Sequence, residues 1–266
     1  MVSKLINEDC RSLLEKEGLL DIGEIFRRED TETVKALLEV RQTFRLQTAE
    51  GTLLYLKRYT NPPPDPFWDL IGARRFPSPA SREFTVLVRL RELGIPAPVP
   101  AACLEEASRK RVTRAALVTL GLPASTTLET LARDGSVSAH RRAALARRLG
   151  RLTCAMHEGG VNHRDFYFVH LLVGDGDRVF VTDLNRADLR RHVGRRWRIK
   201  DLAALLQSAP PEVTLRDKVR FARAYFGTSL RPHRRFLDSV NAKAARMRAQ
   251  TLRRISQGLP NYHVAG

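Results

Sequence analysis

Residues 162–170 read Asn162-His163-Arg164-Asp165-Phe166-Tyr167-Phe168-Val169-His170, and this stretch decides how the rest of the chain is interpreted. A His-Arg-Asp triplet is followed, five positions after its Asp, by a residue that can bind a metal ion. A further acid, Asp183, closes the short apolar run Val179-Phe180-Val181-Thr182. Two acids in this order and at this spacing are typical of phosphoryl transfer, in which one carboxylate orients the attacking hydroxyl and another holds magnesium.

The triplet has the form of a kinase catalytic loop. Asp165 is the candidate base, with Arg164 beside it, and Asp183 is the candidate magnesium ligand; the alternative is that both acids are ordinary turn residues. His170 stands where protein kinases have Asn. Because imidazole is an indifferent ligand for Mg²⁺, three interpretations of this side chain stay open: metal binding, a hydrogen bond to phosphate, or support of the loop. Leu184-Asn185-Arg186 lacks the Phe-Gly of protein kinases, which argues against a switch of their type.

Two residues in the first half of the chain, Lys57 and Arg41, are candidates for holding the phosphates of a nucleotide, and a third, Glu83, is the candidate partner of Lys57. Lys57 ends the apolar strand Tyr55-Leu56-Lys57, and Glu83, in the expected first turn of a helix, is positioned in the sequence to pair with it. The alternatives are an ordinary strand-end lysine and an acid favoured by the helix dipole. A glycine-rich phosphate loop is missing, and Val40-Arg41-Gln42-Thr43 takes its place, so Arg41 is expected to add positive charge there.

The order of the expected elements indicates an α+β, two-lobed fold of the protein-kinase type. Alternating residues predict a hairpin from strands 43–47 and 53–57, and an apolar run predicts a buried strand at 115–119. Apolar periodicity predicts helices from Ser81 to Gly94, at 139–157, 200–208, 215–225 and near 234–255. Gly121, Pro123 and Ser125 mark a hinge. We therefore expect an N-terminal extension at 1–30, a small strand-rich lobe at 31–120, and a helical lobe at 121–266.

The composition limits the classes of partner. The chain has 266 residues and a formal net charge of +17, which favours anionic partners such as nucleic acid, lipid headgroups, phosphorylated glycans or acidic proteins. A specific nucleic-acid binder is disfavoured because the chain has two tryptophans and few clustered aromatic residues for stacking bases. Three scattered cysteines suggest a reducing compartment and no zinc site. Neither a signal peptide nor a membrane span is expected from the sequence.

The densest basic stretch, residues 190–200, follows Asp183 closely and is expected to flank the mouth of the site. Arginine clusters suit phosphorylated or carboxylated acceptors. The acceptor-binding candidates are Arg186, Arg195, Arg196 and Arg198. The alternative is a solvated loop. Asp201, just beyond, either braces the catalytic loop or caps a helix.

Several of these segments resemble the lipopolysaccharide core heptose kinases, a group of protein-kinase-like Kdo and heptose lipopolysaccharide kinases. The similar segments are Gly160 to Asp165, Asp183 to Ala187, Arg196 to Leu205, Arg216 to Phe226, Thr43 to Arg45 and Tyr55 to Lys57. The resemblance runs from about residue 40 to about residue 230 and is closest from 159 to 226. This chain departs from the family at Leu120, where an acidic residue is usual. The side chain at this position need not matter, because adenine is held mainly by the hinge backbone.

The resemblance implies ATP-dependent transfer of a phosphoryl group to a heptose hydroxyl of the lipopolysaccharide inner core. Asp165 would then be the catalytic Asp, Asp183 and His170 the Mg²⁺ ligands, and Lys57 the nucleotide lysine, with Thr119 and Leu120 at the adenine. It implies work on the cytoplasmic face of the inner membrane of Gram-negative bacteria, as a peripheral protein. Expected partners are the core oligosaccharide, an anionic membrane surface and an acidic protein such as acyl carrier protein. Two alternatives stay open: a kinase of Kdo or another glycan, and a non-catalytic kinase-like scaffold.

Overall fold

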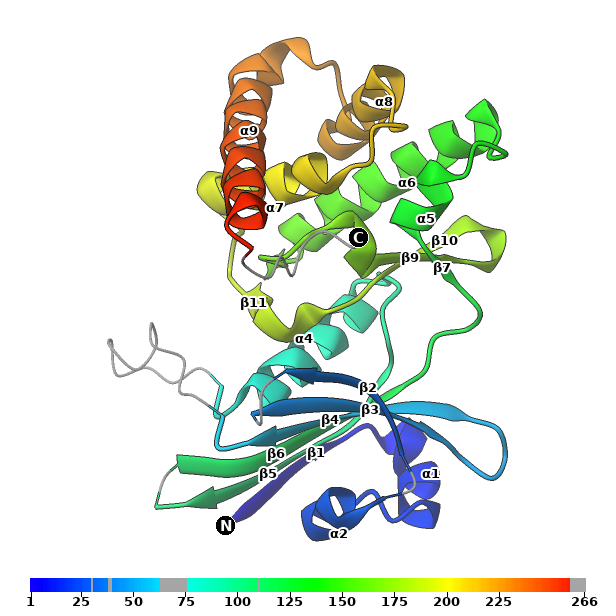
Figure 1. The fold of residues 1–266 in the computed structure, drawn as a ribbon, viewed down its shortest axis with the longest axis vertical. Helices are drawn as coiled ribbons and strands as arrows, with labels where there is room; N and C mark the ends of the chain where they lie inside the picture. Colours follow the sequence, from blue (N-terminus) through cyan, green and yellow to red (C-terminus); the bar gives the residue numbers. More distant parts are fainter. Residues whose placement is uncertain (30, 38–39, 63–75, 110, 259–266) are drawn as a thin grey trace. The chain divides into compact units, whose positions relative to one another are not determined.

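A computed structural model describes residues 1–29, 31–37, 40–62, 76–109 and 111–258 (Figure 1). Contacts within the chain divide it into two compact units. The first comprises Met1–Val88 and Pro98–Leu122, and the second comprises Arg89–Ala97 and Pro123–Gly266. Each unit has its own hydrophobic core.

The first unit is built on an antiparallel sheet with the strand order β1-β5-β6-β4-β3-β2 (Figure 1). The strands are β1 (Val2–Ile6), β2 (Glu32–Leu37), β3 (Arg41–Gln47), β4 (Leu53–Thr60), β5 (Pro100–Ser108) and β6 (Arg111–Leu120). The predicted hairpin is β3 and β4, and the predicted buried strand is the end of β6. Strand β5 was not predicted because its first residues are buried on both faces and therefore show no alternation of apolar and polar residues.

Helices cover both faces of this sheet. On one face, α1 (Arg11–Lys16) and α2 (Ile22–Arg27) pack their buried Leu14 and Ile25 against Leu54 and Leu56 of β4. On the other face, α4 (Pro79–Glu92) packs against Tyr59 of β4. Since successive side chains of a strand alternate between faces, residue 57 shares the α4 face with residue 59.

Residues 1–30, expected as an extension ahead of the sheet, are instead part of this unit. Strand β1 pairs with β5 at the edge of the sheet, and α1 and α2 fill its core. The sequence of β1 hides this role because the strand is short and four of its five residues are exposed, so it shows no alternation of apolar and polar residues.

Helix α4 begins at Pro79, not at Ser81 as predicted. The Ser78 hydroxyl accepts hydrogen bonds from the amides of Ala80 (3.1 Å) and Ser81 (3.2 Å), so Ser78 satisfies the free amides of the first turn. Proline is favoured at the first helical position because it lacks an amide that would need a partner there. The earlier start places Glu83 in the second turn of the helix, not the first.

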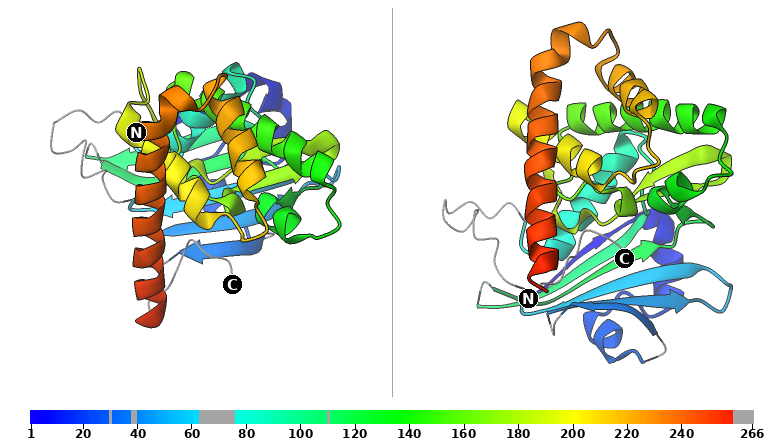
Figure 2. Two further views of the ribbon diagram at one scale, coloured as in Figure 1. Left: turned by 90° about the horizontal axis from the view of Figure 1, so that it is seen from above. Right: turned by 45° about the horizontal axis from the view of Figure 1, so that its top comes forward.

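The second unit is mainly helical. Its α-helices are α5 (Leu128–Arg133), α6 (Ala139–Glu158), α7 (Arg195–Ser208), α8 (Leu215–Phe226) and α9 (Arg234–Ser256), with α9 running as one long helix beside α7 (Figures 1 and 2). Short strands form two small sheets: β7 (Thr126–Thr127), β9 (Leu171–Gly174) and β10 (Arg178–Val181) in one, and β8 (Val161–Asn162) with β11 (Asp188–Leu189) in the other. The structure confirms the predicted α+β mixture.

The predicted helices at 139–157, 215–225 and 234–255 match α6, α8 and α9, but α7 begins at Arg195 and not at Lys200. Half of the basic stretch is therefore helical. Helices α6 and α8 approach closely at Gly150, where a Cβ would lie 2.4 Å from the Phe221 carbonyl oxygen. Leu202, Tyr225 and Val240 form the centre of the core between α7, α8 and α9.

Candidate active site

The His-Arg-Asp triplet lies between β8 and β9 in the second unit, and its Asp is nearly buried. Asp165 is 9% exposed, and its Oδ1 accepts a hydrogen bond of 2.9 Å from Nη1 of Arg186. Arg186 is half exposed, so the ion pair lies at the surface of the unit. Arg164 has a φ of 71°, a left-handed conformation that is uncommon for a residue other than glycine and is often found at functional sites.

Asp201 holds the backbone of this loop. Its carboxylate accepts hydrogen bonds from the amides of His163 (2.8 Å) and Arg164 (2.9 Å). Because α7 begins at Arg195, Asp201 lies well inside the helix, and the alternative that it caps the helix is excluded. The His163 ring donates from Nε2 to the Thr182 carbonyl at 3.0 Å, and burial lowers the pKa of this histidine, so it is neutral at neutral pH.

His170 lies between the two candidate acids. Its Nδ1 is 2.8 Å from the Asp165 carbonyl oxygen, and because a carbonyl only accepts, Nδ1 carries the proton. In the neutral ring, the other nitrogen then presents a lone pair, and this Nε2 lies 3.4 Å from Oδ2 of Asp183. Two electron-rich atoms facing each other at this distance are suited to share a cation.

Asp183 also has a left-handed backbone, with φ 53° and ψ 57°. Among the described residues, no group of three or more His, Cys, Asp or Glu side chains forms a complete metal-binding cluster. This does not argue against magnesium, because Mg²⁺ is commonly held by one or two protein ligands together with phosphate oxygens and water. Asp183 with His170 fits that pattern.

The predicted Lys57–Glu83 ion pair is present in the first unit. Lys57 Nζ lies 2.6 Å from Glu83 Oε1, and the two side chains are 18% and 5% exposed. Lys57 comes from β4 and Glu83 from α4, which packs on that face of the sheet. A buried pair of this kind holds the ammonium in place, with two of its three protons left for other acceptors.

The other residues predicted to contact the nucleotide lie at the ends of strands in the same unit. Arg41 opens β3 and pairs in register with Tyr59. Thr119 is buried near the end of β6, and Leu120 is the last residue of that strand. The amide of Leu120 already donates to the Val99 carbonyl at 2.9 Å, so it is not the free backbone donor that an adenine would need.

The four predicted acceptor arginines have different surroundings. Arg186 binds Asp165, and Arg196 is exposed on the first turn of α7. Arg195 lies against α9, with its guanidinium 5.5 Å from the centre of the Phe236 ring. Arg198 is half-buried and donates to the Val193 carbonyl at 2.8 Å. The structure brings Arg186 alone of the four into contact with the catalytic loop.

Lys200 was missed as a site residue because it was read only as part of the basic stretch. Burial lowers its pKa, the nearby charges of Arg164 and Arg186 lower it further, and Asp165 and Asp201 act in the opposite direction. Its neighbours therefore include the candidate base Asp165 and the anchor of the catalytic loop, Asp201.

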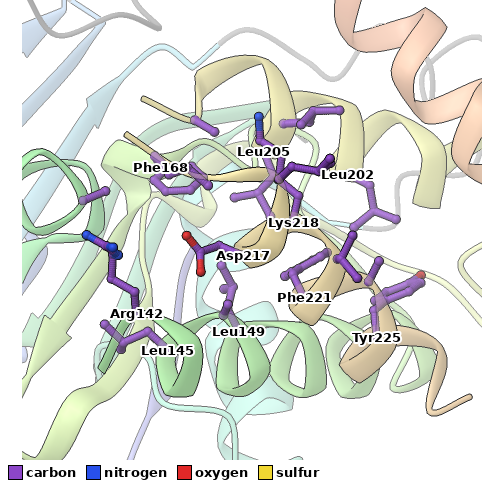
Figure 3. A pocket seen from close by; sticks show the side chains of 18 of the residues that line it. Arg142, Leu145, Leu149, Phe168, Leu202, Leu205, Asp217, Lys218, Phe221 and Tyr225 are labelled. Atoms are coloured by element: carbon purple, nitrogen blue, oxygen red, sulfur yellow. The ribbon is translucent and has the colours of Figure 1, made fainter. Parts of the chain in front are cut away.

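A large apolar pocket occupies the helical part of the second unit (Figure 3). Its volume is about 280 Å³, and its walls come from α5 to α9. Leu145, Leu149, Leu205 and Phe221 face it, and Tyr225 closes one end (Figure 3). An unfilled apolar space of this size is suited to a hydrocarbon ligand.

Comparisons with known proteins identify the family of this chain. The model of the lipopolysaccharide kinase (Kdo/WaaP) family matches residues 45–225. The chain belongs to this family.

Two members of the family, a heptose kinase and a Kdo kinase, are similar in sequence to this chain. Lipopolysaccharide core heptose(I) kinase WaaP of Escherichia coli is 30% identical over 248 residues, which cover 87% of this chain and 90% of that protein. The 3-deoxy-D-manno-octulosonic acid kinase of Vibrio cholerae is 26% identical over 175 residues, covering 65% and 70%. The solved structure described as WaaP in complex with acyl carrier protein has a TM-score of 0.73 at 29% identity, covering 92% of this chain and 98% of that one.

Membership of the family makes the chain an ATP-dependent phosphotransferase with a kinase-like fold, as the motifs predicted. The identification from the His-Arg-Asp segment and its flanks is confirmed. In the part of the chain that the structure describes, no helix has the length and apolar content needed to cross a membrane.

Proposed function

We propose that this kinase transfers the γ-phosphoryl group of ATP to a heptose hydroxyl of the lipopolysaccharide inner core. The observation that carries the proposal is the arrangement of Asp165 and Asp183 around His170 in a loop anchored by Asp201. The choice of a heptose over Kdo is supported by the greater similarity to the heptose(I) kinase, 30% against 26% identity.

Asp165 acts as the base at the acceptor. Its nearly buried carboxylate orients the attacking hydroxyl and takes up its proton as the new P–O bond forms. In the structure, Arg186 pairs with one of its oxygens, which holds the carboxylate in place until an acceptor arrives. Asp183 and His170 would hold Mg²⁺, which, when bound, neutralises charge on the nucleotide phosphates.

The phosphates of ATP are held from the first unit. Lys57, fixed by Glu83, supplies a positive charge from within β4, and Arg41 supplies another at the start of β3. Thr119 and Leu120 lie at the end of β6, where adenine would contact the backbone. Since the Leu120 amide is already used, the carbonyl of this residue is the group left to accept from adenine.

The acceptor is an anionic glycan, and arginines are suited to it. Arg186 is the foremost candidate, because it is half exposed and already bound to Asp165. Arg196, on the first turn of α7, supplies a second exposed guanidinium. Arg195 and Arg198 contribute less directly to acceptor binding. The guanidinium group of Arg195 lies against α9, and that of Arg198 donates to the Val193 carbonyl.

Acyl carrier protein is a fitting partner. The solved relative is described as a complex with acyl carrier protein. An acidic carrier complements a chain with a net charge of +17. The apolar pocket between α5 and α9 offers a place for the acyl chain itself (Figure 3).

The enzyme works at the inner face of the inner membrane as a peripheral protein. Helix α9 supports this placement, because its second half has no acidic residue and carries the exposed cations Arg246, Arg248, Arg253 and Arg254. Leu252 and Ile255 on the same half are also exposed. Basic and apolar side chains together are typical of a helix that lies on an anionic lipid surface.

The decisive experiment measures transfer of labelled γ-phosphate from ATP, with Mg²⁺, to lipopolysaccharide that lacks core phosphate. Wild type should label the glycan, and Asp165→Ala should reduce the rate by about a thousandfold or more while the protein stays folded. Retained activity in Asp165→Ala would contradict the role of this acid. A parallel reaction with a Kdo acceptor distinguishes the two sugars, and labelling of Kdo alone would contradict the heptose assignment.

A further inference from the structure

A series of buried polar groups connects the wall of the apolar pocket to the catalytic loop, entirely within the second unit. The Tyr225 hydroxyl of α8 lies 2.9 Å from Nδ1 of His157, near the end of α6. Nε2 of His157 lies 3.4 Å from Oδ2 of Asp201. The His157 and Asp201 side chains are completely buried, and Tyr225 is 3% exposed. Such contacts cannot be replaced by water without opening the core.

The direction of each contact follows from its chemistry. The Asp201 carboxylate only accepts, so the His157 nitrogen that faces it carries the ring proton. At 3.4 Å this is an electrostatic contact and not a hydrogen bond, and Nε2 has no other hydrogen-bond partner among the described residues. The other nitrogen, Nδ1, then accepts from the Tyr225 hydroxyl. Burial raises the pKa of Tyr225 to about 12, against the opposing charge and hydrogen bond of Arg198, so the phenol is protonated at neutral pH and can donate.

The series Tyr225–His157–Asp201 ends at the backbone amides of His163 and Arg164, through which Asp201 holds the catalytic loop. Oδ2 of Asp201, the oxygen that His157 faces, is also the one that accepts from the His163 amide at 2.8 Å. Oδ1 accepts from Arg164 at 2.9 Å. The orientation of one carboxylate therefore sets the backbone immediately before Asp165.

We propose that Tyr225 and His157 are positioning residues of this kinase, which orient Asp201 and thereby hold the catalytic loop in register. The proposal rests on the proposed function, in which Asp165 is the base. Neither residue touches the reacting atoms, so both act through the loop backbone.

The same geometry couples the loop to the pocket. The Tyr225 ring is part of the pocket wall (Figure 3) and lies 6.2 Å from Phe221, centre to centre, at 12°. A hydrocarbon chain that fills the pocket contacts the ring whose hydroxyl orients His157. Occupancy of the pocket therefore restrains the catalytic loop.

The test compares Tyr225→Phe with Phe226→Leu. The first variant removes the hydroxyl and keeps the ring; the second disturbs a ring that packs edge-on against Tyr225 at 5.0 Å and leaves the hydroxyl contacts in place. Hydrogen exchange at the His163 and Arg164 amides is measured by mass spectrometry, without nucleotide or acceptor. We expect exchange roughly five- to tenfold faster in Tyr225→Phe, the effect of losing one hydrogen bond, and unchanged at these amides in Phe226→Leu.

The kinetic readout is a fall in kcat of similar size in Tyr225→Phe, with a KM for ATP that changes little, because Lys57, Arg41 and the adenine contacts proposed above lie in the other unit. Unchanged exchange at the two amides in Tyr225→Phe, or equal acceleration in both variants, would overturn the positioning role. Because exchange is measured without an acceptor, this failure is distinct from a wild type that does not phosphorylate heptose.

The coupling is tested with acyl carrier protein loaded with a dodecanoyl chain, against the same protein without a chain. The loaded protein should slow exchange at the two amides in wild type about threefold or more, and this slowing should be lost in Tyr225→Phe. Absence of slowing in wild type, or equal slowing in both, would overturn the coupling.

Discussion

The chemistry of this kinase depends on a few side chains whose protonation and direction follow from their immediate contacts. His170 must carry its proton on Nδ1 because it faces a carbonyl, and this frees Nε2 toward Asp183. His163 is kept neutral by burial. Neither property is visible in the sequence, which left three roles open for His170.

At this scale, the buried Lys57–Glu83 pair gives a direct prediction. Lys57→Met should lower the transfer rate by about a hundredfold or more, because it removes a charge that stabilises the nucleotide phosphates. Glu83→Gln should have a smaller effect, since the lysine remains but is less firmly held. Initial rates at saturating acceptor, with nucleotide binding measured by calorimetry, check both.

Arg45→Gln serves as the control for charge, because Arg45 is an exposed residue of the neighbouring strand whose ion pair, with Glu32, is 3.6 Å long. It should retain the wild-type rate. Equal losses in Lys57→Met and Arg45→Gln would mean that the net charge of the unit, and not the fixed ammonium, is what matters.

Among the elements, α8 shows how a helix end supports the site. Thr214 and Asp217 form a reciprocal capping box at its start, and Arg220 binds the same carboxylate at 3.0 Å. Partial burial raises the pKa of Asp217, but hydrogen bonds from Thr214 and Arg220 outweigh it and leave the pKa below 3.8. The far end of this helix carries Tyr225, so the cap helps to define the pocket wall.

Asp217→Asn should therefore lower the free energy of unfolding by about 1 kcal/mol near neutral pH. A carboxyl whose pKa is depressed by folding contributes stability above its unfolded-state pKa and loses that contribution as the pH falls through its folded-state pKa. The difference between wild type and variant should be constant well above pH 3.8 and shrink below it.

Urea unfolding at several pH values measures this difference. Asp238→Asn is the matched control, because Asp238 is exposed on α9, and it should change stability little at any pH. A wild-type advantage that persisted unchanged at acid pH would show that the Asp217 side chain acts by packing and not by charge.

For the whole molecule, the net charge of +17 dominates encounters with partners. Binding of an acidic carrier protein should weaken about tenfold or more as salt rises from low to high ionic strength, since surface charges are screened over about 10 Å at 0.1 M. The part of the affinity that depends on the acyl chain should change little, because apolar burial is not screened.

Titrations of loaded and unloaded carrier at two salt concentrations separate the contributions. The unloaded carrier should lose most of its affinity at high salt, and the loaded carrier should keep the advantage that its chain provides. An advantage of the chain that vanished with salt would argue against the apolar pocket as its binding place.

The sequence by itself determined the reaction class and the helical second unit, because the catalytic loop is contiguous and amphipathic helices show their period locally. It also predicted the Lys57–Glu83 pair from the order of strand and helix, and that pair is present. The local sequence pattern predicted the wrong start for two helices. Helix α4 is capped by Ser78 and not by Ser81, and α7 begins at Arg195 and not at Lys200.

Contacts between distant segments were decided only by the tertiary structure. Residues 2–6 join the sheet because β1 pairs with β5, about a hundred positions later, as in the pairing of Val2 with Glu106. Asp201 reaches the His163 amide, and Tyr225 reaches His157, through the packing of α6, α7 and α8. The apolar pocket likewise exists only where five helices meet, since each lining residue alone looks like ordinary core. Periodicity records which face of an element is buried, but not which partner buries it.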